Sequence, residues 1–371
     1  MAKCPYFGKC GGCSSQHIDY KTQLENKKNM LAHTINFKDI HLVHDEPFHY
    51  RNRMDFIFHP KGIGLRAKGK WYHTVDVEQC IISNEKLNKL ITEVRTHFKG
   101  VDTFDLKKNM GTFRFAVIRT PGDDSSISFV LNEDSTKLQE ATDKIKEFAK
   151  TTSANNIIVT RVSPKTDASI SEDYFVVKGE ENLKETLHNK EFHFHAQGFF
   201  QNNTNMANKL QDYVQTLIKK HNTKDMHLLD LYGGVGTFGI INSDFFKSTT
   251  IVEDYKGSIE IANENIKINN SNNTRAIVMD AKQLRKVDLQ QPLFVITDPP
   301  RSGMHHKTIQ RLNYLEPEVI IYISCNPKQL GKELLKFPDY KIKSAAMFDL
   351  FPQTPHAEAV VELVRTGHPQ Q

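Results

Sequence analysis

Cysteine and tryptophan are scarce in this chain, and long apolar runs are missing from it. Its 371 residues include five Cys and one Trp. So few cysteines, odd in number, do not make a disulfide scaffold, so we expect a reducing, cytoplasmic setting in which they act as ligands or nucleophiles. No stretch approaches the roughly 18 consecutive apolar residues that a membrane-spanning helix needs. No apolar segment follows Met1, so the sequence predicts neither a membrane protein nor a secretory signal.

An excess of charge of one sign is also absent from the chain as a whole, because its formal net charge is only +5. The distribution is uneven, with 20 Lys and Arg against 12 Asp and Glu in residues 1–120 and 29 against 32 in the rest. The densest basic stretch runs from Arg51 and Arg53 to Lys70, with aromatic residues such as Trp71 in or beside it. This pattern suits a surface that neutralises phosphates and stacks bases. A solvated strand above an aromatic core explains it equally well.

Two kinds of patterning divide the chain near residue 195. Residues 1–195 mix short alternating strands with helices, which predicts an α+β domain with antiparallel pairing. In residues 196–371, short apolar strands alternate with helical stretches, which is typical of a parallel sheet covered by helices. We expect strands over 54–58, 126–131, 157–162, 227–231, 249–252, 276–279, 293–297 and 319–324, edge strands over 344–348 and 357–364, and helices over 22–35 and 136–150.

A glycine-rich turn, Tyr232-Gly233-Gly234-Val235-Gly236, joins a predicted strand to a predicted helix. It continues into a formal match to the dinucleotide-binding pattern G-x-G-x-x-G, but Asp230 at the strand end would repel a pyrophosphate. Glu253, at the end of the next strand, is well placed for ribose hydroxyls. A cofactor with a sulfonium, an amino acid and a ribose, but no phosphate, fits these carboxylates better. The pattern favours S-adenosylmethionine, with Asp280 at the end of the third strand beside the adenine amino group.

Two later strand ends carry candidate chemistry. Asp298-Pro299-Pro300 follows the fourth strand of the second half, at the edge where open α/β sheets bind ligands, and this motif also occurs in enzymes that methylate exocyclic amines. Cys325 follows the fifth strand, where its thiolate would be a nucleophile. Amine methylation needs no thiolate, whereas C5 of a pyrimidine becomes nucleophilic only after addition at C6. A base must then remove the C5 proton, and the residues alone leave both His356 and Glu358 as candidates.

Three of the five cysteines lie close together near the N-terminus, as Cys4-x5-Cys10-x2-Cys13, and Cys80 follows at a distance. Four thiolates suit either tetrahedral zinc or a [4Fe–4S] cluster. Paired C-x2-C zinc spacing is missing, so the pattern favours iron–sulfur. The five-residue gap and the candidate fourth ligand argue against radical S-adenosylmethionine chemistry.

Together these segments resemble the RNA (uracil-C5)-methyltransferase family, whose members make 5-methyluridine in tRNA and large-subunit rRNA. The resemblance rests on residues 4–13, 50–53, 199–202, 230–236, 298–303, 324–327 and 356–358. It implies an α/β, Rossmann-like class I methyltransferase domain at the C-terminus, preceded by an N-terminal and central α+β RNA-binding domain with a [4Fe–4S] cluster. It implies RNA as the partner and no obligate protein partner.

The resemblance also implies roles for individual residues. Cys325 matches the nucleophile that adds to C6 of uracil, and Glu358 matches the base that removes the C5 proton. Gln201 matches a residue that binds cofactor and substrate, and Phe199 one that stacks on the target base. The predicted sets are Gln201, Asp230, Tyr232, Gly233, Gly234, Gly236, Glu253, Asp280 and Asp298 for the cofactor; Phe199, Arg51 and Arg53 for the RNA; and Cys4, Cys10, Cys13 and Cys80 for the cluster.

The chain departs from longer members of that family at its N-terminus. Those members carry a small β-barrel RNA-binding domain ahead of the cysteines, whereas three residues precede Cys4 here, so we expect RNA contact on the central domain. Segments 198–202 and 348–356 look most like the rRNA-directed members, so rRNA is favoured over the tRNA T-loop. The alternatives are an exocyclic-amine methyltransferase using Asp298, an NAD(P) oxidoreductase, and a non-catalytic RNA-binding iron–sulfur protein.

Overall fold

The computed structural model describes residues 3–366, and the chain forms two compact units. The first unit comprises the chain up to Tyr20, Glu46–Glu185 and Phe194–Thr204. The second comprises Lys21–Asp45, Thr186–His193 and the chain from Asn205 on. Within residues 3–366, no helix is long and apolar enough to cross a membrane.

The two units interleave along the chain, which differs from the single boundary predicted near residue 195. Lys21–Asp45, expected in the first domain, belongs to the second unit. The reason is that β1 (Ile40–Val43) pairs in parallel with β16 (Tyr340–Phe348) at the far end of the sequence. Conversely, Phe194–Thr204 belongs to the first unit. Pairing between distant segments leaves no local pattern, so a linear reading of the sequence does not detect it.

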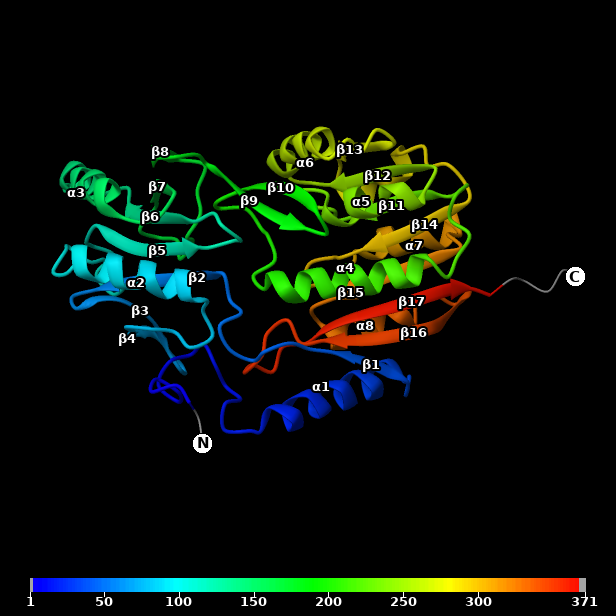
Figure 1. The fold of residues 1–371 in the computed structure, drawn as a ribbon, viewed down its shortest axis with the longest axis horizontal. Coiled ribbons are helices and arrows are strands. Elements are labelled where there is room, and N and C mark those ends of the chain that lie inside the picture. The colour runs from blue at the N-terminus through cyan, green and yellow to red at the C-terminus, as the bar shows by residue number, and fades with distance from the viewer. Residues whose placement is uncertain (1–2, 367–371) are drawn as a thin grey trace, which may run out of the picture. The chain divides into compact units, whose positions relative to one another are not determined.

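A seven-stranded sheet forms the frame of the first unit, in the order β4-β3-β2-β5-β6-β7-β8 (Figure 1). Neighbouring strands of this sheet are antiparallel, except that β6 and β7 are parallel to each other. The elements are β2 (Arg53–His59), β3 (Gly62–Ala67), β4 (Lys70–Asp76), α2 (Glu85–His97), β5 (Phe113–Arg119), β6 (Ser126–Asn132), α3 (Leu138–Thr151), β7 (Asn156–Val162) and β8 (Tyr174–Lys178). A hairpin of β9 (Asn182–Leu187) and β10 (Lys190–His195) follows.

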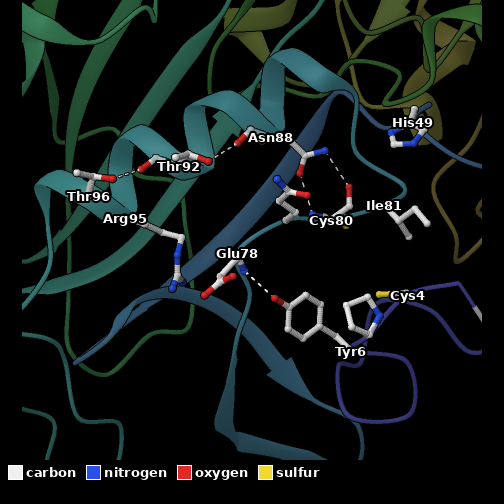
Figure 2. Close-up of a pocket in the computed structure, with 12 residues that line it drawn as sticks. Cys4, Tyr6, His49, Glu78, Cys80, Ile81, Asn88, Thr92, Arg95 and Thr96 are labelled. Carbon is white, nitrogen blue, oxygen red and sulfur yellow. Dashed lines mark hydrogen bonds between the residues drawn. The ribbon is translucent and has the colours of Figure 1, made fainter.

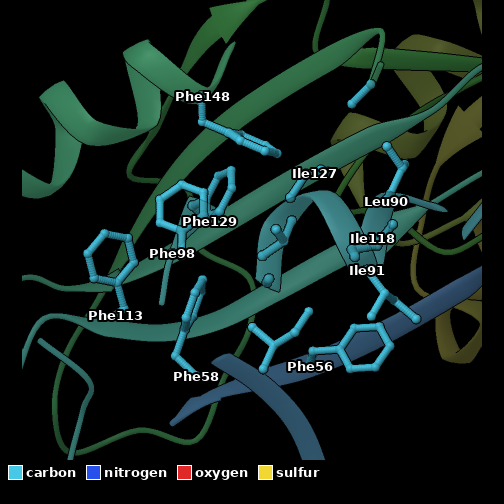
Figure 3. Close-up of a cluster of buried hydrophobic side chains, with 14 of the residues drawn as sticks. Phe56, Phe58, Leu90, Ile91, Phe98, Phe113, Ile118, Ile127, Phe129 and Phe148 are labelled. Atoms are coloured by element: carbon cyan, nitrogen blue, oxygen red, sulfur yellow. The ribbon is translucent and has the colours of Figure 1, made fainter. Parts of the chain in front are cut away.

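Helices α2 and α3 share one apolar core with the strands of this sheet. The core is aromatic: the ring centroid of Phe98 lies 4.7 Å from that of Phe129 and 5.1 Å from that of Phe148 (Figure 3). The Asn84 side chain accepts the N–H of Leu87 at 2.8 Å and so caps α2. Full burial of each such apolar side chain contributes about 1.5–3 kcal/mol. This shared apolar core therefore stabilises the sheet of the first unit.

The second unit is built on an eight-stranded sheet in the order β1-β16-β17-β15-β14-β11-β12-β13. Strands β11–β15 are mutually parallel, and β17 runs antiparallel to both of its neighbours. The remaining elements are α1 (Tyr20–Ile35), α4 (Thr204–Ile218), β11 (His227–Leu231), α5 (Thr237–Asn242), η1 (Ser243–Phe245), β12 (Ser248–Glu253), α6 (Lys256–Ile268), β13 (Thr274–Val278), η2 (Ala281–Lys286), β14 (Leu293–Thr297), α7 (His306–Leu315), β15 (Val319–Ser324), α8 (Pro327–Leu334) and β17 (Glu358–Arg365).

The two strands nearest the C-terminus are not edge strands, which corrects the prediction for 344–348 and 357–364. Strand β17 lies between β15 and β16, and β1 covers the outer side of β16. Burial fits this placement, because the first six residues of β17 are buried. Strand β11 lies between β12 and β14. From β11 the chain first adds β12 and β13 on one side and then crosses over to add β14 and β15 on the other side. Open α/β sheets bind ligands at such a switch point.

Candidate active site

The glycine-rich turn after β11 wraps around the carboxylate of Asp230. This side chain is buried, and its Oδ2 accepts the N–H of Gly239 at 2.7 Å. A Cβ on Gly233 would lie 2.6 Å from the Ile251 side chain and 3.0 Å from Asp230 Oδ2, so glycine is required there. Burial raises the pKa of Asp230 to about 7, against the opposing effect of the Gly239 N–H. The position of Asp230 indicates that it shapes the loop, whereas the sequence suggests that it attracts a cationic ligand directly.

Glu253, at the end of β12, faces this loop. Its Oε2 accepts the N–H of Gly234 at 3.2 Å, and its Oε1 accepts the N–H groups of Asp254 and Tyr255 at 3.0 and 3.1 Å. Gly234 has a φ of +54°, and no heavy atom beyond its chain neighbours lies within 4 Å of a Cβ placed on it. The backbone at Gly234 is therefore open to a ligand. Glu253 stands beside that opening, and its role in binding ribose hydroxyls stays a prediction.

Asp280 lies two residues beyond β13 and caps η2. Its Oδ1 accepts the N–H of Lys282 at 2.9 Å, and its Oδ2 lies 3.2 Å from Lys282 Nζ. The Lys282 N–H, as the main cause, lowers the pKa of Asp280, so the carboxylate is charged at neutral pH. The part of the side chain that remains exposed is available to a hydrogen-bond donor such as an adenine amino group. This role stays a prediction.

Cys325 and Glu358 are brought together by the register of β15 and β17. Ser324 pairs with Ala359 in this antiparallel ladder, so the next residue of each strand end, Cys325 and Glu358, meet at the same edge of the sheet. Glu358 is 5% exposed, and its Oε1 is a buried atom without a hydrogen-bond partner in residues 3–366. His356, the other candidate base, is exposed and its ring packs against Phe351. The geometry favours Glu358 over His356 as the group near the thiol.

Asp298, which directly follows β14, lies near Cys325 and Glu358. One thiol and two carboxyl groups are therefore close together at these strand ends. Burial, followed by the nearby carboxylates of Glu358 and Asp298, raises the pKa of Cys325 to about 11, and Arg301 opposes them. Burial and the Asp298 charge raise the pKa of Glu358 well above its ordinary value. Burial also raises the pKa of Asp298 to about 7. Without a ligand, the thiol is therefore protonated at neutral pH, and the carboxylates have a high affinity for protons.

Two residues outside the predicted set hold these strand ends in place. Asn326 caps α8, and its Nδ2 donates to the carbonyl of Arg301 at 3.0 Å. This bond connects the loop that follows Cys325 with the loop that follows Asp298. Glu333, fully buried in α8, accepts the N–H of Met304 at 3.1 Å and the hydroxyl of Tyr322. The sequence could have indicated Asn326, because it lies between Cys325 and a proline. The sequence gives no indication of the role of Glu333, because nothing distinguishes this glutamate from others in polar helices.

Gln201 and Phe199 lie in the first unit, on the segment that follows β10. Phe199 is 73% exposed, so its ring is accessible, and its role in stacking on the target base stays a prediction. The carbonyl of Gln201 accepts the Nδ2–H of Asn52 at 3.3 Å, and the carbonyl of Asn202 accepts the Asn52 backbone N–H at 3.0 Å. Asn52 is buried and also donates to Thr204 Oγ1 at 3.1 Å. The Tyr50–Arg53 segment thus positions the Gln201 loop through Asn52, a residue whose motif gives no sign of that role.

Arg51 and Arg53 are half-buried and engaged within the first unit. Arg53 pairs with Asp55 through both Nε and Nη2, at 3.0 and 3.2 Å. Arg51 Nε donates to the carbonyl of Arg53 at 2.8 Å. These contacts support a structural role in β2, and they leave the predicted role of both residues in RNA binding without geometric support.

The three cysteines near the N-terminus and the distant Cys80 are brought together in the fold. Cys4, Cys10, Cys13 and Cys80 line one cavity of the first unit. Asn88 holds Cys80 from both sides, because its Oδ1 accepts the Cys80 N–H at 2.8 Å and its Nδ2 donates to the Cys80 carbonyl at 3.0 Å (Figure 2). Burial, and after it the three other thiols, raises the pKa of Cys13 to about 11. Within residues 3–366, however, no three or more His, Cys, Asp or Glu side chains are arranged closely enough to hold a metal ion.

The sequence matches the family model described as tRNA (uracil-5-)-methyltransferase over residues 19–366, which is most of the chain. This chain belongs to the tRNA (uracil-5-)-methyltransferase family. It is therefore an RNA (uracil-C5)-methyltransferase, and the family resemblance inferred from the sequence segments is confirmed. The oxidoreductase, exocyclic-amine and non-catalytic alternatives give way to this assignment.

Individual relatives of this methyltransferase agree with the family match. A Pyrococcus furiosus tRNA (uracil(54)-C(5))-methyltransferase is 34% identical over 370 residues, covering 98% of this chain and 85% of the relative. An uncharacterized RNA methyltransferase of Clostridium tetani is 32% identical, covering 98% and 84%. The crystal structure of Pyrococcus abyssi tRNA (uracil-54, C5)-methyltransferase in complex with S-adenosyl-L-homocysteine superposes with a TM-score of 0.81 at 29% identity, covering 96% and 86%. The predicted α/β methyltransferase fold is thus supported, while the iron–sulfur part of the fold prediction stays a prediction.

Proposed function

We propose that this methyltransferase transfers a methyl group from S-adenosylmethionine to C5 of a uridine in tRNA, with Cys325 as nucleophile and Glu358 as base. The observation that carries the proposal is the β15–β17 register, which sets a thiol beside a buried carboxylate oxygen that lacks a partner in residues 3–366. A base next to a nucleophile is what C5 methylation requires, because the same carbon gains a methyl group and loses a proton.

S-adenosylmethionine supplies the methyl group in this reaction. Cys325 Sγ forms a bond to C6 of the uracil, and the electron pair of the C5–C6 double bond moves to C5 and its carbonyl. Carbon C5 then forms a bond to the methyl carbon of S-adenosylmethionine, whose bond to sulfur breaks, and S-adenosylhomocysteine leaves. Glu358 removes the C5 proton, and the electrons of that C–H bond restore the double bond as the C6–S bond breaks. The enzyme regains its thiolate, and Glu358 passes its proton to solvent.

Activation of Cys325 follows from the charges around it. Its raised pKa means that the ligand-free enzyme holds a thiol at neutral pH. A cationic ligand beside the strand ends, or a proton bound by one of the carboxylates, reverses the main electrostatic causes of that shift. Asp298, whose pKa lies at about 7, titrates in the range where such a change matters. We infer that the thiolate forms only when the site is loaded.

The cofactor is expected at the switch point formed by β11, β12 and β14. The open backbone at Gly234, the adjacent Glu253 and the exposed part of Asp280 support this placement. These two carboxylates would repel a phosphate group, so they favour a cofactor that has none. The relative from Pyrococcus abyssi, described in complex with S-adenosyl-L-homocysteine, supports the same class of cofactor.

The choice of tRNA as target rests on the relatives. Those whose names state a target act on uracil 54 of tRNA, and this favours tRNA over the rRNA that segments 198–202 and 348–356 suggest. The test incubates the purified chain with labelled cofactor and either tRNA or rRNA transcripts and then maps 5-methyluridine. Methylation of tRNA alone supports the proposal, whereas methylation of rRNA alone supports the expectation from those two segments.

The catalytic assignment is tested with 5-fluorouridine RNA. The fluorine at C5 cannot leave as a proton, so the enzyme should be trapped as a covalent adduct at Cys325. Cys325→Ala should form no adduct and show no turnover. Lys328→Ala, an exposed change three residues further along, is the matched control and should behave like the unaltered enzyme. Adduct formation by Cys325→Ala would rule out this nucleophile.

We further propose that Cys4, Cys10, Cys13 and Cys80 hold a [4Fe–4S] cluster with a structural role. The residue types support the proposal, because four sulfur atoms line one cavity. Burial, followed by the three other thiols, raises the pKa of Cys13 and so disfavours its thiolate in the absence of a cation. Metal binding by such a set becomes folding free energy. Iron and sulfide analysis, combined with thermal unfolding before and after chelation, tests this. Unchanged unfolding and RNA affinity after loss of iron would refute the structural role.

A further inference from the structure

The end of the β3–β4 hairpin is exposed at the edge of the first unit's sheet. Strand β4 is the edge of its sheet (Figure 1), and its first four residues, Lys70 to His73, are all exposed. Successive strand residues point to opposite faces, so both faces of the hairpin end meet solvent. Trp71 is 65% exposed and Tyr72 43%, with ring centroids 5.8 Å apart in an edge-to-face arrangement. Burial in the core therefore does not explain these aromatic residues.

The N-terminal loop around Cys10 contacts this hairpin end directly. Cys10 and Ala67 form an antiparallel bridge. The Gly11 N–H donates to the Arg66 carbonyl at 2.8 Å, and the Lys68 N–H donates to the Lys9 carbonyl at 2.7 Å. The loop thus continues the sheet next to β3, so an exposed turn that would otherwise be flexible is held in one conformation.

Four lysines lie on or next to the hairpin: Lys68 and Lys70 flank its turn, the Lys9 carbonyl accepts the Lys68 N–H, and Lys107 contacts the Tyr72 ring. Lys9, Lys68, Lys70 and Lys107 are all exposed, and none has a carboxylate of residues 3–366 within ion-pair distance. Lys107 Nζ lies 5.1 Å from the centroid of the Tyr72 ring. By contrast, the neighbouring Arg66 is paired with Asp167 at 2.5 Å. The hairpin that carries Trp71 and Tyr72 therefore has exposed lysines without an ion-pair partner in residues 3–366.

We propose that this hairpin surface, defined as Lys9, Lys68, Lys70, Trp71, Tyr72 and Lys107, binds the RNA substrate by base stacking on Trp71 and by phosphate contacts from the lysines. Basic side chains around aromatic platforms bind single-stranded or looped nucleic acid. A protein partner fits less well, because lysine is depleted at protein interfaces. The proposal rests on the proposed function for the identity of the RNA. It also moves the expected RNA contact from Arg51 and Arg53, which are engaged internally, to the hairpin end.

Trp71 makes the proposal directly testable, because it is the only tryptophan of the chain. Its fluorescence reports on one site alone. Titration of the full chain with substrate RNA, without cofactor, should give saturable quenching whose midpoint equals the dissociation constant measured by filter binding. Heparin, which carries negative charge without bases, should quench much less. RNA binding without a change in fluorescence, or equal quenching by heparin, would overturn the proposal.

Variants separate stacking from charge. Trp71→Ala should raise KM for RNA roughly tenfold, as loss of one base–aromatic stack predicts, with kcat at saturation unchanged. Trp71→Phe keeps a ring and should retain most of the affinity. Tyr314→Ala, an exposed aromatic residue of the second unit, is the matched control and should leave KM unchanged. An unchanged KM in Trp71→Ala contradicts the stacking role, and circular dichroism checks that this variant is folded.

The lysines are tested through salt. Removal of one lysine that neutralises a phosphate should reduce the slope of log Kd against log salt concentration by about 0.7. A variant with Lys9, Lys68, Lys70 and Lys107 changed to Ala should lose most of its salt dependence, whereas Lys146→Ala on α3 should keep it. An unaltered slope in the fourfold variant would contradict the proposal. Binding without cofactor is independent of methyl transfer, so failure of the proposed function and failure of this surface are distinguishable.

Discussion

Lys27 of α1 and Asp349, just after β16, form an ion pair of 2.6 Å inside the second unit. The side chains are 6% and 0% exposed. Lys27 Nζ also donates to the carbonyl of Phe351 at 3.3 Å. Helix α1 therefore holds the turn that leads from β16 to Glu358.

A second contact between the same helix and turn strengthens this connection. Gln23 Nε2 donates to Oε1 of Gln353 at 3.1 Å. Gln353 is buried and has a φ of +67°, a left-handed conformation that a non-glycine residue adopts only where its surroundings hold it. The start of β17, and with it the candidate base, depends on a helix more than 300 residues away in the sequence.

Lys27→Met should strongly destabilise the enzyme. Removing one partner of a buried ion pair leaves the other charge without compensation, which costs about 3–5 kcal/mol. Urea unfolding of the second unit measures this loss. The double variant Lys27→Met, Asp349→Leu should regain much of the stability, because it leaves no buried charge. If the single variant were as stable as the double one, the ion pair would not be the source of the effect.

Glu358→Gln should stall the reaction after methyl transfer. Without a base, the C5 proton stays on the methylated ring, so the C6–S bond to Cys325 persists. A covalent complex with ordinary tRNA should therefore appear on denaturing gels. His356→Gln is the control and should turn over normally, since that side chain is exposed. Accumulation of the complex in His356→Gln instead would reverse the assignment of the base.

Alkylation of Cys325 should depend steeply on pH in the ligand-free enzyme. Burial and the neighbouring carboxylates raise the pKa of the Cys325 thiol to about 11. The reactive thiolate is therefore scarce at pH 7, and its fraction increases about tenfold per pH unit until that pKa is reached. Iodoacetamide labelling followed by peptide mass spectrometry measures the rate at this site. Adding S-adenosylmethionine at pH 7 should accelerate labelling, because a nearby sulfonium favours the thiolate. Fast labelling at pH 7 without cofactor would contradict the electrostatics.

Asn52→Ala should loosen the Gln201 segment without unfolding the first unit. The variant lacks two side-chain hydrogen bonds, to the Gln201 carbonyl and to Thr204 Oγ1, each of which contributes about 1 kcal/mol. We expect KM to rise for both cofactor and RNA, and hydrogen exchange to speed up in residues 199–204. Asn205→Ala, at an exposed position, serves as the comparison. Unchanged exchange in Asn52→Ala would show that other contacts hold the segment.

Local pattern identified buried strands at the centre of both sheets, but it provided no range for several outer strands and most helices. The apolar runs predicted at 227–231, 293–297 and 319–324 coincide with β11, β14 and β15, because a strand buried on both faces leaves a continuous apolar signal. The same reasoning misplaced β17 as an edge strand. A buried run states that both faces are covered, but it does not state which strands lie beside it.

The amino-acid sequence alone specifies the residue types at the strand ends, and hence the chemistry available there: a thiol at 325 and carboxylates at 298 and 358. It also specifies three thiols near the N-terminus and a fourth at 80. Which of these groups meet depends on the folded chain. The β15–β17 register places Glu358 beside Cys325, β1 and α1 join the second unit from near the N-terminus, and Asp55 engages Arg53, a side chain predicted to bind RNA. The physical reason for the first two is that hydrogen-bond ladders join segments that are far apart in the chain, and such contacts leave no periodic trace in the sequence. For Arg53, the reason is that only the folded structure shows which side chain faces its guanidinium group.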